Sequence, residues 1–188
     1  MRPIFETVTD LASGAGVLRR RAYGLIEVVD GRFRRVRLRP FPKVVSAPQI
    51  LLFGGWHHRH RGGDRVLLYY NQPGRFRNFL VLRYMVSSRQ TRFGTCSRAL
   101  AVLDEIARIK SSDALLCDVG NWRISERLMA RCGWQPHCPS RWHRHYIKRF
   151  YGEYPPRPAW LAGDVTSRWG DSCTVAPAVA VQLPPQRR

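Results

Sequence analysis

Two arginines and one glycine stand where a strand-like stretch gives way to a helix-like one, in the segment SSRQTRFGTCSRALAVLDEIARIK at 87–110. The first N–H groups of a helix have no partner within it, and they carry the positive end of the helix dipole. A phosphate placed there gains hydrogen bonds, glycine permits its close approach, and arginine adds charge-assisted bonds. Arg89, Arg92 and Gly94 therefore predict an anion-binding loop, and the alternative is a loop that only turns a corner.

The elements that position this loop follow from hydrophobic periodicity. Apolar runs on both sides of a Pro-Gly turn predict a central hairpin. Leu100, Leu103 and Ile106 recur at helical spacing and predict a helix, with Thr95 or Ser97 as its N-cap. In chain order we expect strands at 65–71 and 76–86, a helix at 97–110, a strand at 113–121, a helix at 123–134 and a strand at 143–152.

This order of elements predicts an α/β (α+β) fold, with a mixed, mostly antiparallel central sheet and flanking helices. The length of 188 residues suits one domain, which we place at 21–154. A short segment at 1–20 precedes it. The residues at 155–188 are rich in Pro and Ala, and we expect them to form an extended tail.

A second hairpin is predicted at 23–40, around an Asp-Gly turn. In its second run apolar residues alternate with Arg35, Arg37 and Arg39, which gives the strand one apolar face and one basic face. The favoured interpretation is the solvated outer face of an edge strand, and the alternative is a binding stripe.

The formal net charge of +19 favours anionic partners such as phosphate-bearing cofactors or nucleic acid. All but three of the 32 basic residues are arginine, so a bias in genome composition explains the charge equally well. No stretch approaches the roughly 18 apolar residues of a membrane span, and the N-terminus does not resemble a secretory signal. Five cysteines without a CxxC motif are typical of a reduced, cytoplasmic protein.

The loop and its helix resemble the acyl-CoA-binding loop of the GNAT superfamily of N-acyltransferases. The family pattern is Gln or Arg, two residues, Gly, one residue, then Gly or Ala, at the start of the helix after the fourth strand. Arg89 matches its first position and Gly94 its last, whereas Arg92 stands where the first glycine is expected. The resemblance covers roughly 65–152 and implies a GNAT-like fold, in which strands 78–86 and 113–119 run parallel and part at their C-terminal ends.

A second motif supports the resemblance. The segment SERLMARCGW at 125–134 is similar to the family's later helix, which has Ser, Leu, a basic residue and a Gly-aromatic pair at set intervals. The matching positions here are Ser125, Leu128, Arg131, Gly133 and Trp134.

The resemblance implies an acyl-CoA-dependent N-acyltransferase that uses acetyl-CoA or another acyl-CoA as co-substrate and no metal. The strand near Tyr84 and Val86 would pair with the pantetheine arm, and the helix start would hold the pyrophosphate. The cofactor-binding residues it implies are Tyr84, Val86, Arg89, Arg92, Phe93, Gly94, Thr95 and Asn121.

Departures from the family pattern concern the catalytic groups. Met129 stands where the family often has a tyrosine that protonates the leaving thiolate. Asp118 and Glu27 are the acids available as general base, and Asp118 is the candidate we retain. These departures keep a second hypothesis open, in which a noncatalytic GNAT-like module binds nucleic acid or another polyanion through its basic faces.

Two histidine-rich stretches raise a metal site as an alternative. One is GGWHHRHRGG at 54–63, and the other contains Cys132, His137, Cys138, His143 and His145. Neither matches a known ligand spacing, so packing or surface histidines remain the favoured interpretation.

Overall fold

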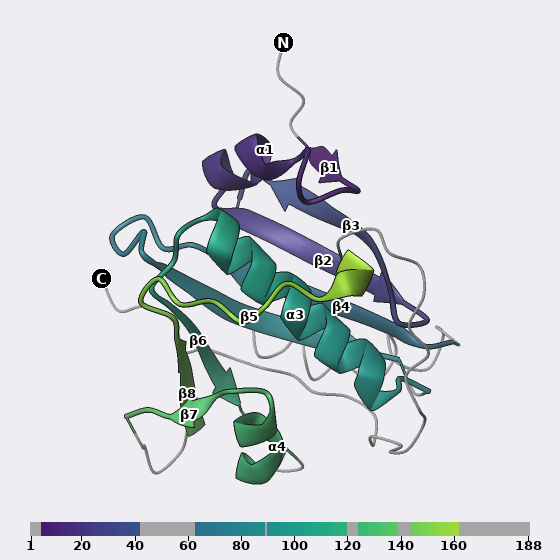
Figure 1. The fold of residues 1–188 in the computed structure, drawn as a ribbon, viewed down its shortest axis with the longest axis vertical. Coiled ribbons are helices and arrows are strands. Elements are labelled where there is room, and N and C mark those ends of the chain that lie inside the picture. The colour runs from purple at the N-terminus through teal and green to yellow at the C-terminus, as the bar shows by residue number, and fades with distance from the viewer. Residues whose placement is uncertain (1–4, 42–62, 89, 120–123, 139–143, 162–188) are drawn as a thin grey trace.

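One sheet of eight strands runs through the part of the chain that the computed structural model describes, which is residues 5–41, 63–88, 90–119, 124–138 and 144–161 (Figure 1). The strands are β1 (Glu6–Val8), β2 (Tyr23–Val29), β3 (Arg32–Arg39), β4 (Arg65–Asn71), β5 (Phe79–Ser87), β6 (Ala114–Val119), β7 (Gln135–Pro136) and β8 (Arg144–Arg149). The helices are α1 (Ala15–Arg20), α3 (Phe93–Ile109) and α4 (Glu126–Arg131), followed by a 3₁₀ turn, η1 (Ala159–Leu161). In these described ranges no helix combines the length and apolar character needed to cross a bilayer.

The strand order is β1-β3-β2-β4-β5-β6-β8-β7, and every neighbouring pair is antiparallel except β5 and β6. The expected mixed, mostly antiparallel α+β sheet is therefore confirmed. The parallel relation expected for strands 78–86 and 113–119 is confirmed as well, because α3 is the crossover that joins β5 to β6.

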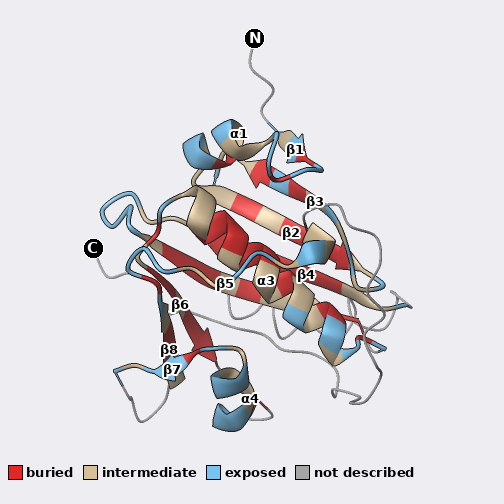
Figure 2. Ribbon diagram, viewed as in Figure 1, coloured by how far each residue is buried: buried red, intermediate tan, exposed pale blue. Residues whose placement is uncertain are grey.

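The core lies between the sheet and α3, which crosses one face of it (Figure 2). The strands contribute Ile26, Leu68 and Leu80, and α3 contributes Leu103 and Ile106, all fully buried. Burying an aliphatic side chain of this size stabilises the fold by roughly 1.5–3 kcal/mol. The core therefore fixes α3, and with it the loop that precedes α3, against the sheet.

A close contact between neighbouring strands requires the glycine on β2. A Cβ atom at Gly24 would lie 2.5 Å from the ring of Tyr70, its register partner on β4. Tyr70 is fully buried and packs over this glycine, and burial raises the pKa of its hydroxyl. A larger side chain at Gly24 would force the ring or the strand to move.

The alternation expected on β3 is confirmed, because Val36 and Leu38 are fully buried and Arg37 is exposed. The expectation that this is an edge strand is wrong. The segment before the first hairpin supplies β1, which pairs with β3 from Glu6 opposite Leu38 to Val8 opposite Val36. Beyond β8, Trp160 and Leu161 pack against the core, and residues 162–188 lie outside the described part.

The second motif helix, α4, spans Glu126–Arg131, which is shorter than the expected 123–134. The Ser125 hydroxyl accepts a hydrogen bond from the Leu128 N–H at 3.2 Å, as an N-cap does. At the other end Gly133 has a φ of +80°, and the Trp134 N–H bonds back to the Met129 carbonyl at 3.0 Å. This is a Schellman arrangement, and Gly133 ends the helix.

Candidate functional site

Strands β5 and β6 part before either of them ends. Their parallel pairing reaches Leu82 opposite Cys117 and stops, although β5 continues to Ser87 and β6 to Val119. Figure 1 shows β6 and β8 turned away from β5 beyond this point. The expected divergence at the C-terminal ends is therefore confirmed, and it gives the last residues of β5 a side that β6 does not pair with.

A β-bulge lies at the same point of β5. Tyr69 of β4 pairs with Tyr84, but Tyr70 pairs with Leu82, so Arg83 has no register partner on β4. An extra residue bends its strand and increases the local twist. The bulge gives a physical reason for the divergence, because it redirects β5 directly after its last pair with β6.

The start of α3 is capped from a distant part of the chain. Asp64, just before β4, accepts hydrogen bonds from the Arg92 N–H at 3.1 Å and from the Thr95 hydroxyl at 2.5 Å. The helix begins at Phe93, four residues before the expected 97. The expectation that Thr95 or Ser97 is the N-cap is wrong, because Thr95 lies inside the first turn and donates to the Asp64 carboxylate instead.

The loop between β5 and α3 is fastened to the start of β4. The Arg65 N–H donates to the Ser88 hydroxyl at 3.0 Å, and the Thr91 hydroxyl donates to the Arg65 carbonyl at 3.1 Å. The side chains of Ser88 and Thr91 lie 2.9 Å apart, and both residues are buried. Ser88 and Thr91 are therefore fixed against β4, and pre-organisation of this kind lowers the entropy cost of binding.

The outer side of the helix start is open and positively charged. Gly94 is exposed, and a Cβ atom built on it would meet nothing within 4 Å. The N–H groups of Phe93 and Gly94 are at positions that have no acceptor within the helix. Arg92 is exposed beside them, and the Arg131 guanidinium of α4 lies 5.3 Å from the centre of the Phe93 ring. Because Gly94 has no side chain and faces open space, an anion can approach these N–H groups closely.

The cofactor-binding residues expected from the sequence fall into three groups. Arg92, Phe93, Gly94 and Thr95 are brought together at the helix start, although Thr95 is already engaged by Asp64. Tyr84 and Val86 lie on β5 beyond the parting, and Arg89 and Asn121 lie outside the described residues.

The ring of Tyr84 on β5 is buried beside a second tyrosine ring. It is 8% exposed, and its centre lies 6.1 Å from the centre of the Tyr69 ring on β4. Burial, reinforced by Tyr69, raises the pKa of its hydroxyl. This phenol therefore stays protonated at neutral pH.

Asp118 lies directly after the last residue of β6 that pairs with β5. It is fully buried and stands opposite His145 of β8, with 3.9 Å between its Oδ1 and the histidine Nδ1. This distance is longer than a hydrogen bond and allows an ion pair when the imidazole is protonated. The sequence suggested His145 only as a metal ligand, and its pairing with Asp118 depends on a strand register that the sequence does not reveal.

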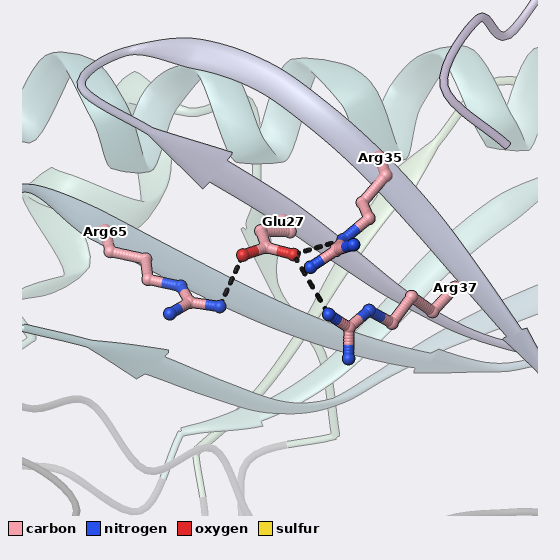
Figure 3. A network of polar contacts seen from close by, with 4 residues as sticks. All are labelled: Glu27, Arg35, Arg37 and Arg65. Carbon is pink, nitrogen blue, oxygen red and sulfur yellow. Dashed lines mark hydrogen bonds and ion pairs between the residues drawn. The ribbon is translucent and has the colours of Figure 1, made fainter. Parts of the chain in front are cut away.

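Glu27, the other acid considered as a base, is held by arginines from two neighbouring strands (Figure 3). Its carboxylate accepts hydrogen bonds from Arg35 Nε at 2.7 Å and from Arg65, and Arg37 lies 3.9 Å away. Burial alone would raise the pKa of Glu27, but the hydrogen bond from Arg35 and the three positive charges lower it below its usual value. A carboxylate stabilised in this way is a weak base.

The described residues contain no group of three or more His, Cys, Asp or Glu side chains arranged to hold a metal ion. His57, His58, His60 and His143 lie outside those residues. Of the described cysteines, Cys96 on α3 is a free thiol whose pKa burial raises to about 12. Such a thiol is a poor nucleophile at neutral pH.

Comparisons of this chain with protein-family models, with curated proteins and with solved structures give no match. The geometry of the site is therefore the basis on which a function can be assigned. Asp64, which gives the helix start its shape, was not anticipated from the sequence. No local signal marks this residue, because it caps a helix that begins 29 positions later, at Phe93.

Proposed function

We propose that the chain is a cytoplasmic N-acyltransferase of the GNAT type, which takes acetyl-CoA or another acyl-CoA as its acyl donor. The observation that supports this proposal most strongly is the parallel pair β5 and β6, which parts beside a bulge. The anion-binding helix start follows closely, because β5 ends at Ser87 and α3 begins at Phe93. A long donor with an amide-bearing arm and a pyrophosphate matches these two features in the same order.

Each part of the donor has a counterpart in the site. The pantetheine arm adds to β5 near Tyr84 and Val86, on the side that β6 has left, by the hydrogen-bonding mode of strand addition. The pyrophosphate lies on the N–H groups of Phe93 and Gly94. Arg92 contributes charge from the loop, and Arg131 is placed by α4 to do the same.

The transfer itself needs a deprotonated amine. The acceptor nitrogen attacks the thioester carbonyl, a C–N bond forms, and the C–S bond breaks to release the thiolate. The surplus proton on the nitrogen passes to the released thiolate or to solvent as the amide forms. His145, whose Nδ1 lies 3.9 Å from the Asp118 carboxylate, is the base that accepts the proton from the acceptor ammonium. Met129 cannot protonate the thiolate, and a thiol of pKa near 8.5 leaves without a general acid.

The proposal is tested by calorimetric titration of the protein with CoA and with desulfo-CoA. Gly94→Val places a branched side chain where the pyrophosphate would approach, and Gly74→Val is the matched control. Both glycines face open space, but Gly74 lies in the turn between β4 and β5, at the other end of the sheet. We expect the parent and the control to bind both ligands and Gly94→Val to lose at least tenfold in affinity.

Two outcomes would overturn the proposal. If the parent protein does not bind CoA, the divergence of β5 and β6 does not serve to bind an acyl-CoA. If Gly94→Val stays folded and binds CoA like the parent, the loop only turns a corner. A further variant, His145→Ala, should keep CoA binding and lose acetyl transfer to primary amines, and unchanged transfer would remove His145 from the mechanism.

A further inference from the structure

The face of the sheet opposite α3 carries three arginines around one buried carboxylate. Arg35 and Arg37 of β3, Arg65 of β4 and Glu27 of β2 form this group, which we term the Glu27 cluster (Figure 3). The β3 arginines alternate with apolar residues that pack toward α3, so they project from the other face. The side chains of the cluster therefore project away from α3, although the backbone of Arg65 also fastens the loop that precedes α3.

The Glu27 cluster has more positive charge than its carboxylate neutralises. Three guanidinium groups and one carboxylate leave two net positive charges, and no other ion pair of these arginines is found in the described ranges. The side chains of Arg35 and Arg37 are 37% and 47% exposed, whereas that of Glu27 is 7% exposed. The carboxylate orients the guanidinium groups from below, and most of their N–H donors remain available to a ligand from solvent.

The neighbouring residues extend this positive charge along β3. Arg39 follows Arg37 at the next position that projects from the same face, opposite Tyr23 of β2. Alternate residues of a strand lie about 6.6 Å apart, since each residue rises about 3.3 Å. Neighbouring phosphates along a nucleic acid strand are separated by a distance of the same order, so a row of arginines on one strand can contact successive phosphates.

We propose that this face binds the sugar–phosphate backbone of a single-stranded nucleic acid, with Arg35, Arg37 and Arg39 contacting successive phosphates. The guanidinium fork suits phosphate oxygens, and a net charge of +19 strengthens the attraction at long range. A lipid surface is a poorer match, because membrane-binding faces place large apolar side chains beside their basic ones. On β3 the row consists of arginines, and the residues opposite Arg37 and Arg39 on β2, Leu25 and Tyr23, are only partly exposed.

The test measures binding of a fluorescein-labelled RNA of about 20 nucleotides, and of the DNA of the same sequence, by anisotropy between roughly 50 and 300 mM NaCl. Arg37→Gln with Arg39→Gln removes two charges from the row and keeps the hydrogen bonds of Arg35 and Arg65 to Glu27. Arg75→Gln with Arg77→Gln removes two charges from the exposed β4–β5 turn and is the matched control. Melting curves of both variants establish that they are folded.

We expect the parent protein to bind and its affinity to fall steeply with salt. Loss of two phosphate contacts should reduce the slope of log K against log salt by about 1.4, given roughly 0.7 per contact on a single strand. The control should keep the parental slope, and CoA binding by both variants should be unchanged. The last readout separates this inference from the proposed acyltransferase function.

Three results would overturn the inference. The first is that the parent protein does not bind nucleic acid at about 50 mM NaCl. The second is that both double variants reduce the slope of log K against log salt by the same amount. The second result would mean that binding depends on the total positive charge of the protein and not on the arginines of β3. The third is binding to vesicles that contain anionic phospholipid without binding to either oligonucleotide, which would make this face a membrane contact.

Discussion

The Asp64 carboxylate accepts a hydrogen bond from the Thr95 hydroxyl at 2.5 Å, across 31 positions of sequence. The same carboxylate accepts the Arg92 N–H, so one acidic side chain satisfies two donors at the start of α3. It also places a negative charge beside the helix end proposed to hold a pyrophosphate. Asp64 therefore has two opposing effects, since it stabilises the helix and repels an anionic ligand.

Replacing this carboxylate by an amide separates the two effects. Asp64→Asn keeps an oxygen that can accept the Arg92 N–H but removes the negative charge. We expect the free energy of unfolding to fall by about 1 kcal/mol, a typical value for a weakened cap. CoA affinity should rise several-fold, because the pyrophosphate no longer faces a carboxylate. Urea denaturation and CoA titration measure the two quantities, and weaker CoA binding by the variant would show that Asp64 shapes the site more than it repels the ligand.

Two glycines should respond to alanine with opposite signs. Gly94 lies in the first turn of α3 and faces open space, so Gly94→Ala should raise the free energy of unfolding by up to about 1 kcal/mol through helix propensity. Gly133 has a φ of +80°, and a Cβ atom there would lie 3.1 Å from Lys148 Cε. Gly133→Ala should cost about 1–2 kcal/mol. Equal effects of the two variants in denaturant titrations would contradict this difference in backbone geometry between the two glycines.

The sequence predicted the elements whose signals are local. Alternation on β3 and helical spacing on α3 follow from side-chain burial alone, and the end of α4 follows from Gly133. Contacts between distant segments could not be predicted. Asp64 caps α3 through a tertiary contact, and Glu27 meets Arg65 only because β2 and β4 pair in one particular register.

The same limit applies to the candidate site. Arg92 and Gly94 were identified from their types and spacing, because a helix start has the same unsatisfied N–H groups in every protein. The bulge at Arg83 has no local signal, since it depends on how β5 aligns with β4. The pairing of Asp118 with His145 likewise depends on the register between β6 and β8.

A buried ion pair joins three elements on the α3 side of the sheet. Lys148 Nζ of β8 lies 2.7 Å from Asp104 Oδ2 of α3 and 3.1 Å from the Cys132 carbonyl after α4. Both charged side chains are largely buried, at 13% and 15% exposure. Burial raises the pKa of Asp104 even though Lys148 opposes the shift.

Removing one member of this pair should cost more than removing both. Lys148→Met leaves the Asp104 carboxylate buried without its cation, and we expect a loss of about 3 kcal/mol in the free energy of unfolding. Adding Asp104→Asn to that variant should recover most of the loss, because no buried charge remains. A double-mutant cycle in urea measures the coupling. Additive losses in the cycle would show that the two charges act independently.

Lys110 is a second largely buried amine, but its partners are uncharged. Its Nζ donates to the Arg21 carbonyl and to Gln72 Oε1, each at 2.8 Å, at the junction of α1, α3 and the turn after β4. No carboxylate pairs with it within the described part of the chain. Burial therefore lowers the pKa of Lys110 from its usual 10.5 to about 8.

This lowered pKa predicts a pH dependence of stability with a definite sign. Between about pH 8 and pH 10.5 the unfolded chain keeps the Lys110 proton while the folded chain has lost it, so this group makes stability rise with pH. The buried thiol of Cys96, whose pKa is raised to about 12, acts in the opposite direction above pH 9. Lys110→Met removes the first contribution and keeps the second. The difference in free energy of unfolding, parent minus Lys110→Met, should therefore increase between pH 7.5 and pH 10 in urea titrations. A difference that stays constant over this range would mean that the Lys110 amine is fully hydrated in the folded protein.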